Sequence, residues 1–377
     1  MDFALSDSQN LIINSIKEFA LKKLNDGVLS DDEAANFRLD KWKSCHEMNI
    51  MGLPFPEEYG GLGMDTLTTV LGVKALARYC MDEGLVFSVC AQMSAVAMPI
   101  FLFGTEEQKK KYLSKMISGE FIGAIAISEA NAGSDVSSLL TTITESDGGY
   151  VINGCKTFIT LAPYAQIILV YAKHPRGIKS MDVSAVILEK GEYGIGQIYN
   201  KSGLRTSPIS EVIIDRARVG AERILGRAYL GMRCFFKSML WEKILMSAYH
   251  VGAMEQQYDE AVAYAREREQ FGKKIIEFES IYSRLIEMKR NIETCDLMLM
   301  KTCWDFDNGD QRPGKAAMLK LHTSECKLQN SLNASHILGA YGYMKESVTE
   351  KQMRDSLAAG LYSGTCEMQR KIIAEEL

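Results

Sequence analysis

The sequence predicts an α+β protein with a helical N-terminal part, a β-rich middle and a helical C-terminal part. Three observations support this order. Helical patterns with capping signals fill the chain up to about residue 118. Short β-branched runs separated by turn signals follow, and long proline-poor helical patterns return after residue 226. We therefore expect three domains: α-helical over 1–118, a β-barrel or sandwich over 119–226, and an α-helical bundle over 227–377.

The N-terminal helices are predicted from caps and periodicity. Ser6 and Gln9 have the spacing of a capping box, in which each side chain bonds the other residue's backbone. A second helical block covers 66–103, where we expect Gly84 to break the helix and Pro99 to kink or stop it. Thr105 begins another capping box.

The β-rich middle is predicted from short runs that are rich in Ile, Val and Thr. Turn signals such as Asp147-Gly-Gly and Asn153-Gly lie between them. This pattern is typical of an all-β barrel or sandwich of about 100 residues. The expected strands are 121–127, 150–154, 157–160, 166–171, 183–188 and 212–214.

Composition narrows the class of protein. The 377 residues are 47% apolar and 24% charged, as in ordinary globular proteins, and the net charge of -5 argues against nucleic-acid binding. The nine cysteines are scattered without metal-site spacing, so we expect reduced thiols, no metal and a cytoplasmic location. With neither a leader-like N-terminus nor an apparent 18-residue apolar run, we expect no secretion and no membrane span.

One carboxylate stands out in the stretch 231–272, which is predicted to be one long helix. Glu242 lies on an otherwise apolar helical row. A buried carboxylate is costly unless it is paired, and this pattern alone favours an ion pair with a neighbouring helix. The alternative is a general base whose pKa is raised by burial. The other members of the row are Phe235, Met239, Met246, Tyr249 and Ala253.

Five segments, taken in order, resemble motifs of the flavin-dependent acyl-CoA dehydrogenase family. The third of them matches the family's T-E-P-x-A-G-S-D turn, with Ser128 for Thr and Ala130 for Pro. The resemblance spans most of the chain and implies that family's fold, with an N-terminal helical domain, a middle β domain and a C-terminal four-helix bundle. The segments are 56–63, 104–109, 127–135, 266–273 and 339–343.

The resemblance implies FAD between the β domain and the C-terminal helices. Ser128 would hydrogen-bond the flavin ring, Phe158 would stack near it, and Thr160 would reach its N5 edge. Without the resemblance, Phe158 and Phe271 would be assigned to a core. The cofactor residues implied within one subunit are Ala126, Ile127, Ser128, Gly133, Ser134, Phe158, Thr160, Thr365 and Glu367.

A second set of residues is implied to hold the cofactor of a neighbouring subunit, with Arg268 on its pyrophosphate. Gly339 and Gly342 would let the backbone approach that pyrophosphate, and His336 stands where the family usually has Gln. The set consists of Arg268, Gln270, Phe271, His336, Gly339 and Gly342. It requires at least a dimer, and the family commonly forms homotetramers.

The sequence departs from the family at the usual catalytic base, the Glu of a Y-E-G-T segment. This chain reads Tyr362-Ser363-Gly364-Thr365, and a serine cannot remove a carbon-bound proton unaided. Some members carry the base on the long helix, before a basic residue, and Glu242 resembles that position. The resemblance therefore implies that Glu242 is the base. Ser134, Lys243, Tyr362 and Ser363 are the implied substrate contacts.

Local likeness is greatest to the prolyl-carrier-protein dehydrogenases of natural-product assembly lines. Many CoA-using members carry an Asp that touches the pantetheine arm, and here that position is Leu240. The resemblance implies oxidation of a carrier-tethered L-prolyl thioester to a pyrroline or pyrrole: Glu242 removes the α-proton and the β-hydrogen leaves as a hydride to flavin N5. The segments with this likeness are 84–87, 97–100, 239–242, 303–304 and 363–377.

Alternatives remain at this point. The chain could be a dehydrogenase of short branched acyl-CoA esters or of another carrier-bound acyl group, or a catalytically silent flavoprotein. The electron acceptor is either an electron-transfer flavoprotein or O2. Carrier proteins are acidic, so a basic docking patch is expected, with Lys173, Arg176 and Lys179 as candidates.

Overall fold

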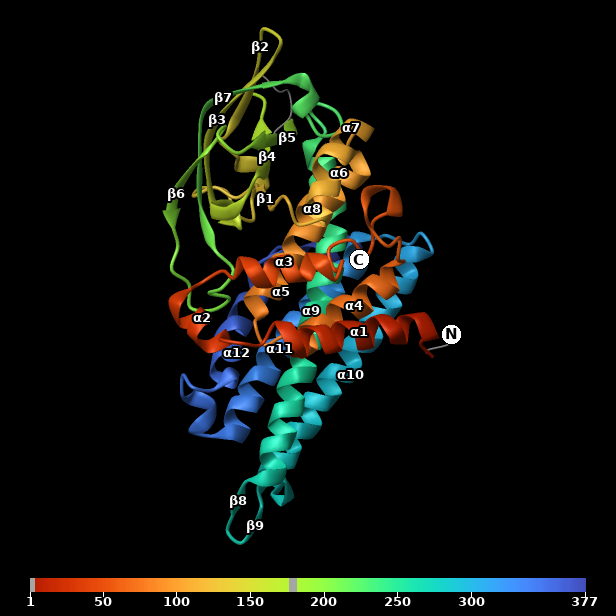
Figure 1. Ribbon diagram of the computed structural model, residues 1–377, viewed down its shortest axis with the longest axis vertical. Helices are drawn as coiled ribbons and strands as arrows, with labels where there is room; N and C mark the ends of the chain where they lie inside the picture. The colour runs from red at the N-terminus through yellow and green to blue at the C-terminus, as the bar shows by residue number, and fades with distance from the viewer. Residues whose placement is uncertain (1–3, 176–181) are drawn as a thin grey trace.

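The computed structural model describes residues 4–175 and 182–377. A curled β-sheet lies at one end, helices fill the middle, and long helices project to a β-hairpin at the opposite end (Figure 1). Arg176 and Lys179 of the expected docking patch lie outside the described residues. The N-terminal helices are α1 (Asp7–Lys23), α2 (Val28–Ala34), α3 (Leu39–Glu47), α4 (Thr66–Tyr79), α5 (Glu83–Gln92), α6 (Met98–Phe103), α7 (Glu106–Gln108) and α8 (Ser114–Ile117).

The capping box at the chain start is confirmed. Gln9 N donates to Ser6 Oγ at 3.2 Å, and Ser6 N donates to Gln9 Oε1 at 3.0 Å. The predicted break at Gly84 is wrong: the helix ends at Tyr79, and Gly84 lies inside α5. There a Cβ would come within 2.1 Å of Thr206 Oγ1, so close packing rather than flexibility requires the glycine.

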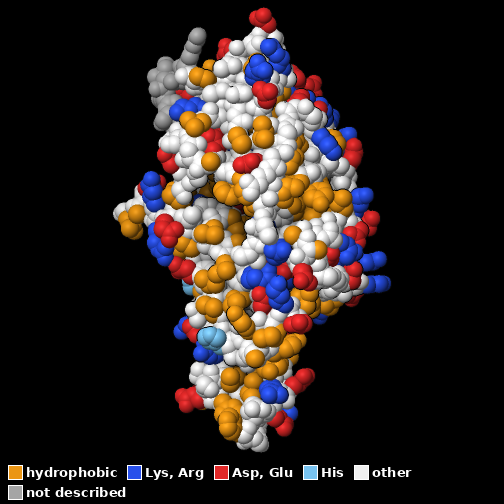
Figure 2. Space-filling model, turned by 90° about the vertical axis from the view of Figure 1, so that its left-hand side faces the viewer, with side chains coloured by type: hydrophobic (Ala, Val, Ile, Leu, Met, Phe, Trp, Pro, Cys, Tyr) orange, Lys and Arg blue, Asp and Glu red, His pale blue; other side chains and the backbone are white. Residues whose placement is uncertain are grey.

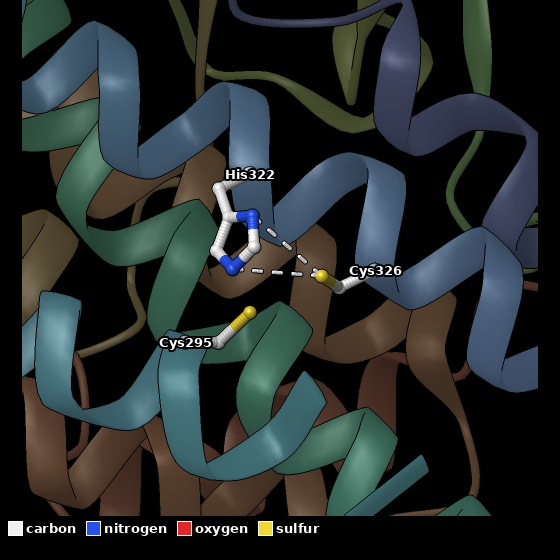
Figure 3. Close-up of side chains that lie close together, drawn as sticks. All are labelled: Cys295, His322 and Cys326. Atoms are coloured by element: carbon white, nitrogen blue, oxygen red, sulfur yellow. Dashed lines mark hydrogen bonds between the residues drawn. The ribbon is translucent and has the colours of Figure 1, made fainter. Parts of the chain in front are cut away.

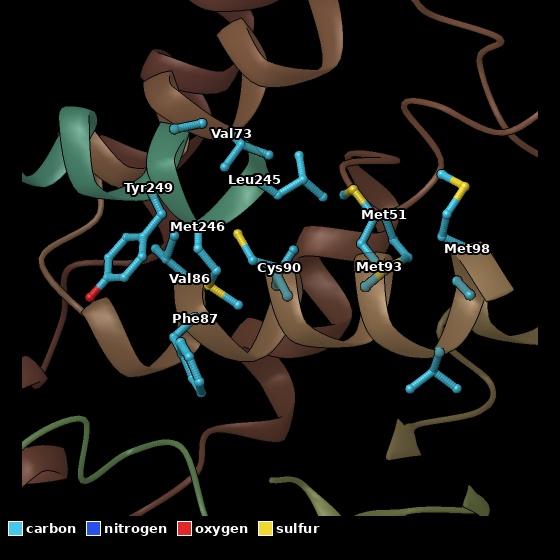
Figure 4. Close-up of a cluster of buried hydrophobic side chains, with 14 of the residues drawn as sticks. Met51, Val73, Val86, Phe87, Cys90, Met93, Met98, Leu245, Met246 and Tyr249 are labelled. Atoms are coloured by element: carbon cyan, nitrogen blue, oxygen red, sulfur yellow. The ribbon is translucent and has the colours of Figure 1, made fainter. Parts of the chain in front are cut away.

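The segment around Pro99 does not stop the helix either. A π-helical turn over Met93–Ala97 precedes α6, and the helix continues to Phe103. The stretch Glu83–Phe103 is long and apolar enough to cross a membrane by length and composition, so the expectation that no such run exists was wrong. In this structure 83% of its most apolar window is buried inside the protein. Figure 4 shows side chains of this stretch packed against Leu245, Met246 and Tyr249.

The middle of the chain forms one mixed sheet of seven strands in the order β1-β4-β2-β3-β7-β6, with β5 paired to β4. β1 pairs with β4 in parallel, and β3 is antiparallel to β2 and β7. Two expected strands, 150–154 and 157–160, are parts of the single long strand β3. The strands are β1 (Gly123–Ala126), β2 (Thr142–Ser146), β3 (Gly149–Thr160), β4 (Ile167–Lys173), β5 (Val183–Glu189), β6 (Gly194–Ile198) and β7 (Ile209–Gly220).

The C-terminal part is built around α9, a helix of 37 residues that packs against α4, α10 and α11. The helix predicted over 231–272 ends at Glu267, and a two-stranded hairpin follows. Near this hairpin a separate small apolar core joins α9, α10 and α11. The elements are α9 (Gly231–Glu267), β8 (Glu269–Gln270), β9 (Lys273–Lys274), α10 (Glu279–Asp307), α11 (Pro313–Leu338), α12 (Val348–Leu357) and α13 (Cys366–Ala374).

Candidate active site

Glu242 lies on the buried face of α9 and is only 9% exposed. Its Oε1 accepts a hydrogen bond from Ser363 Oγ at 2.5 Å. Its Oε2 is buried and has no hydrogen-bond partner among the described residues, and no ion pair to Glu242 occurs within residues 4–175 and 182–377. The ion pair that the apolar row favoured is therefore not what the structure shows.

Ser363 is held in place by a tightly bonded turn. Its φ is 57°, so the turn places this residue in the left-handed region, just before α13. Gln369 Nε2 donates to the carbonyl oxygens of Ser363 and Gly364, at 3.1 and 2.8 Å. Lys320 Nζ donates to the Gly364 carbonyl at 2.9 Å, and Thr365 caps α13. The Ser363 hydroxyl that donates to Glu242 therefore extends from a backbone turn that these hydrogen bonds hold in place.

Burial sets the electrostatics around this carboxylate. Burial raises the pKa of Glu242, while the Ser363 hydrogen bond and the charges of Lys243 and Lys320 oppose that rise. Burial also lowers the pKa of Lys243 to about 8 and that of Lys320 to about 8. A carboxylate with a raised pKa and an unpartnered oxygen is suited to accept a proton.

Tyr362 directly precedes Ser363, the residue that donates to Glu242. Its ring centroid lies 4.7 Å from that of Phe87, and its hydroxyl lies 2.6 Å from His250 Nε2. Burial lowers the pKa of His250 well below its usual value, so this ring is neutral and can accept from Tyr362. Thr323 Oγ1 lies 3.2 Å from the other ring nitrogen. The tyrosine is therefore fixed in orientation.

The turn after β1, which carries Ser128, is fixed to the sheet. Thr157 N donates to the Ser128 carbonyl at 2.9 Å, which ties the turn to β3. A buried ion pair of 2.8 Å between Lys156 and Glu129 fixes the same turn. Ala126 ends β1, and Ile127 packs against the main core.

Phe158 is not a core residue. It is 60% exposed, its φ is 58°, and its ring centroid lies 4.9 Å from that of Tyr199. A register shift between β3 and β7 falls between Lys156 and Ile159, and this irregularity turns the ring outward. Thr160 is the last residue of β3.

The turn that carries Gly133 and Ser134 approaches the first turns of α13. Hydrogen bonds from Ser137 and Ser138 lower the pKa of Asp135, and the charge of Lys371 in α13 adds to this effect. A Cβ at Gly133 would meet no atom within 4 Å, so the space beside this turn is open. Glu367 lies in the exposed first turn of α13.

The second set of expected cofactor residues lies elsewhere. Arg268 caps the C-terminal end of α9, and Gln270 and Phe271 lie in the hairpin, where Phe271 is 94% exposed. At about 1.5 Å per helical residue, Arg268 is about 39 Å along α9 from Glu242. The structure therefore does not bring the two sets together within one chain, and the core assignment fails for Phe271 as well.

A hollow of about 710 Å³ lies near this distal end and is lined by His336, Gly339 and Arg284, among others. Gly339 has a φ of 63°, and a Cβ there would meet nothing within 4 Å. Gly342 differs, because a Cβ would lie 2.8 Å from the Ser335 carbonyl oxygen and 2.9 Å from Leu338 Cβ. Packing at the end of α11 is thus sufficient to require this second glycine.

Three domain families match the chain in the order of its three parts. They are "Acyl-CoA dehydrogenase, N-terminal domain" over residues 6–120, "middle domain" over 124–217 and "C-terminal domain" over 230–377. The chain belongs to the acyl-CoA dehydrogenase family. The sheet between two helical parts is therefore the family's architecture.

Individual members of the acyl-CoA dehydrogenase family resemble the whole chain. An L-prolyl-[peptidyl-carrier protein] dehydrogenase of Pseudomonas fluorescens is 36% identical and is covered over 100% of both chains. A solved structure described as "PigA with FAD and proline" matches with a TM-score of 0.96 and 34% identity, covering 100% of this chain and 99% of that one. Butyryl-CoA dehydrogenase from Megasphaera elsdenii matches with a TM-score of 0.96 and 32% identity, covering 100% and 99%.

Three side chains that shape the candidate site were not predicted from the sequence. Lys320 and Gln369 bond the turn that carries Ser363, and His250 bonds Tyr362. His250 lies two helical turns after Lys243 on α9, so helical periodicity places these two polar side chains on the same row of the helix. That spacing was the available signal for His250. Lys320 and Gln369 carry no comparable local signal.

Proposed function

We propose that this chain is an FAD-dependent dehydrogenase that oxidises the Cα–Cβ bond of an L-prolyl thioester tethered to a carrier protein. The observation that carries the proposal is the buried Glu242, whose Oε2 is unpartnered while Ser363 occupies the family's usual base position. The relative from Pseudomonas fluorescens and the PigA structure support the prolyl substrate.

The chain's residues fit the cofactor. The exposed Phe158 and the open space at Gly133 offer an aromatic surface and room for close backbone approach. We assign FAD binding in one subunit to Ala126, Ile127, Ser128, Gly133, Ser134, Phe158, Thr160, Thr365 and Glu367. FAD, when bound, supplies the acceptor for the hydride that leaves the substrate β-carbon.

We assign the distal residues to the cofactor of a neighbouring subunit. The distance of about 39 Å along α9 supports this, because Arg268 cannot serve the site at Glu242 in its own chain. On the face seen in Figure 2, hydrophobic side chains gather over the helical half of the molecule. Exposed apolar side chains such as Phe271, Tyr341 and Tyr343 favour an assembly, and we propose a homotetramer. The assigned residues are Arg268, Gln270, Phe271, His336, Gly339 and Gly342.

In the proposed reaction Glu242 Oε2 takes the α-proton, which the thioester carbonyl acidifies. Ser363 holds the other carboxylate oxygen, so the accepting oxygen has a fixed direction. Tyr362 and the buried helices exclude water from the carboxylate, and we place Ser134 and Lys243 at the substrate. The first product is a pyrroline; a second oxidation would give a pyrrole.

We propose a carrier protein rather than CoA as the thioester carrier. Leu240 is a buried apolar residue where CoA-using members often have an Asp for the pantetheine arm. Lys173 at the end of β4 is the described part of the expected docking patch. The nine cysteines are all free thiols, which supports a reducing, cytoplasmic location.

The test is incubation with L-prolyl-loaded carrier protein, L-prolyl-CoA and short branched acyl-CoA esters, followed by mass measurement of the product. We expect the carrier-bound prolyl group to lose two or four hydrogens and the CoA esters to react slowly. Faster oxidation of a branched acyl-CoA would contradict the proposal. A flavin that no thioester bleaches would instead indicate a silent flavoprotein. Following H2O2 and the reduction of electron-transfer flavoprotein identifies the acceptor.

A further inference from the structure

A second cluster of reactive side chains lies outside the proposed active site. Cys295 of α10 faces His322 and Cys326 of α11 (Figure 3), and one ligand atom from each lies within 4.8 Å of the others. Cys326 Sγ is 3.8 Å from His322 Nδ1 and 3.7 Å from Nε2. Residues 322 and 326 are one turn apart, so both side chains project from α11 toward α10. The proposed reaction uses none of the three.

We propose that Cys295, His322 and Cys326 bind a Zn²⁺ ion through two thiolates and one imidazole, with a fourth position open to water. The separations fit. Tetrahedral zinc with ordinary Zn–S and Zn–N bonds requires an S···N separation of about 3.6 Å and an S···S separation of about 3.8 Å. The distances of 3.8 and 3.7 Å from Cys326 Sγ to the two ring nitrogens of His322 are close to the S···N requirement. Cys295 Sγ lies within 4.8 Å of the ligand atoms of His322 and Cys326, which leaves the third ligand within reach of the same ion.

The surroundings also suit a cation. Cys295 is 0% exposed and Cys326 is 7% exposed, while His322 is partly exposed and leaves an entrance from solvent. Thr294 Oγ1 lies 3.3 Å from His322 Nε2 and can hold that nitrogen, leaving Nδ1 for the metal.

The site is expected to act on stability rather than on chemistry. Lys320, which bonds the turn of Ser363, is two residues from His322 and so projects from a different side of α11. Zinc would join α10 to α11 behind the active site and would stabilise the folded chain by binding it alone. No metal was expected because the cysteines lack metal-site spacing in the sequence. The packing of α10 on α11 brings Cys295 to His322 and Cys326.

The test uses the full-length holoenzyme, freed of metal by a chelator under reducing conditions, and then Zn²⁺ or Co²⁺ salts alone. We expect one Zn²⁺ per chain to be retained against a chromophoric competitor, a higher Tm with zinc, and a thiolate-to-metal absorption band with Co²⁺. The variants His322→Gln and Cys326→Ser should lose the band. Cys303→Ser, which removes another buried thiol of α10, should keep it.

Two results would overturn the proposal. One is a wild-type chain that retains no zinc or shows no thiolate band after reduction. The other is unchanged zinc retention in both His322→Gln and Cys326→Ser. If Cys326→Ser fails to fold, His322→Gln decides alone, because its partly exposed ring is not part of the core.

Discussion

Two buried glutamates in the helical core have opposite surroundings. Glu83 of α5 is at most 1% exposed and is bonded by Lys327 Nζ at 2.6 Å and by the Tyr249 hydroxyl. Glu242 lies two turns before Tyr249 on α9 and receives one hydrogen bond, from Ser363. In each carboxylate one oxygen lacks a hydrogen-bond partner among the described residues. The two glutamates therefore differ in that Glu83 contacts an ammonium group, that of Lys327, whereas Glu242 contacts no cation directly in the described part of the chain.

This comparison shows that burial alone does not identify a catalytic carboxylate. The charge of Glu83 is neutralised by an ammonium group in direct contact, which suits a structural role. Glu242 is desolvated without such a contact, and burial therefore raises its pKa. A desolvated carboxylate that can still accept a proton is the one suited to general-base chemistry.

The largest effect is expected for Glu242→Gln. The amide cannot accept the α-proton, and loss of a general base costs about 10²- to 10⁴-fold in rate, so we expect kcat to fall by about 10³-fold or more. The flavin spectrum should remain, because the amide keeps the shape of the side chain. Turnover on the prolyl-loaded carrier and flavin absorbance measure the two effects. A variant with most of its activity left would refute Glu242 as the base.

The same variant tests the raised pKa through stability. A carboxyl whose pKa is higher in the folded than in the unfolded state contributes stability below the unfolded value, near 4.3, and loses that contribution as pH rises through the folded pKa. Wild type should therefore lose stability over this window relative to Glu242→Gln. Urea unfolding between about pH 4 and 8 measures the difference. Parallel stability curves would show that the pKa of Glu242 is not raised.

Glu83→Gln should affect stability instead of chemistry. It leaves the ammonium of Lys327 buried without a counter-charge, and breaking a buried pair costs about 3–5 kcal/mol. Urea unfolding measures this loss, and kcat per folded enzyme should change little. The double variant Glu83→Gln with Lys327→Met is the control and should recover part of the stability. A large loss of kcat with unchanged stability would reverse the roles of the two glutamates.

The sequence predicted one of these glutamates and not the other, for a physical reason. Glu242 was visible because it interrupts an apolar helical row and because Ser363 stands at the family's usual base position. Glu83 opens α5, where an acidic residue is ordinary, and its partner Lys327 is far away in the chain. Pairings made by tertiary packing leave no local pattern, which also explains why Lys320 and Gln369 were missed.

The fold, too, has features that local sequence patterns predict and features that depend on tertiary packing. Helix caps, the α-β-α order and the hydrophobic strands were predictable from local patterns, and most of the expected strands occur. The strands β2 and β6 were not predicted. Most residues of both strands are exposed or half-buried, and β6 includes two glycines, Gly194 and Gly196. The break after Tyr79, the π-helical turn before Pro99 and the outward Phe158 depend on how neighbouring elements pack.

Tyr249→Phe should have a smaller effect, again on stability. Its hydroxyl contacts both Glu83 and Lys327, and a buried hydrogen bond to a charged group contributes about 1.5–3 kcal/mol. We expect a loss in this range, with kcat close to wild type, although the residue shares α9 with Glu242. Urea unfolding and turnover measured together separate the two effects. A rate loss greater than the loss of folded enzyme would extend the catalytic region to this tyrosine.

The smallest effect is expected for Ser363→Ala, and it should depend on pH. The Ser363 hydroxyl donates to Glu242, and this bond opposes the rise that burial causes in the pKa of Glu242. Removing it should raise that pKa further. Because the base acts when ionised, the acidic limb of the kcat profile should move to higher pH, and the loss of activity should be confined to the acidic side of the profile. Ser356→Ala, which removes a buried hydroxyl bonded within α12, is the matched control and should leave the profile in place. A uniform loss at all pH values would assign Ser363 to substrate positioning instead, whereas the expected shift makes this serine the residue that keeps an otherwise unpaired carboxylate ionised.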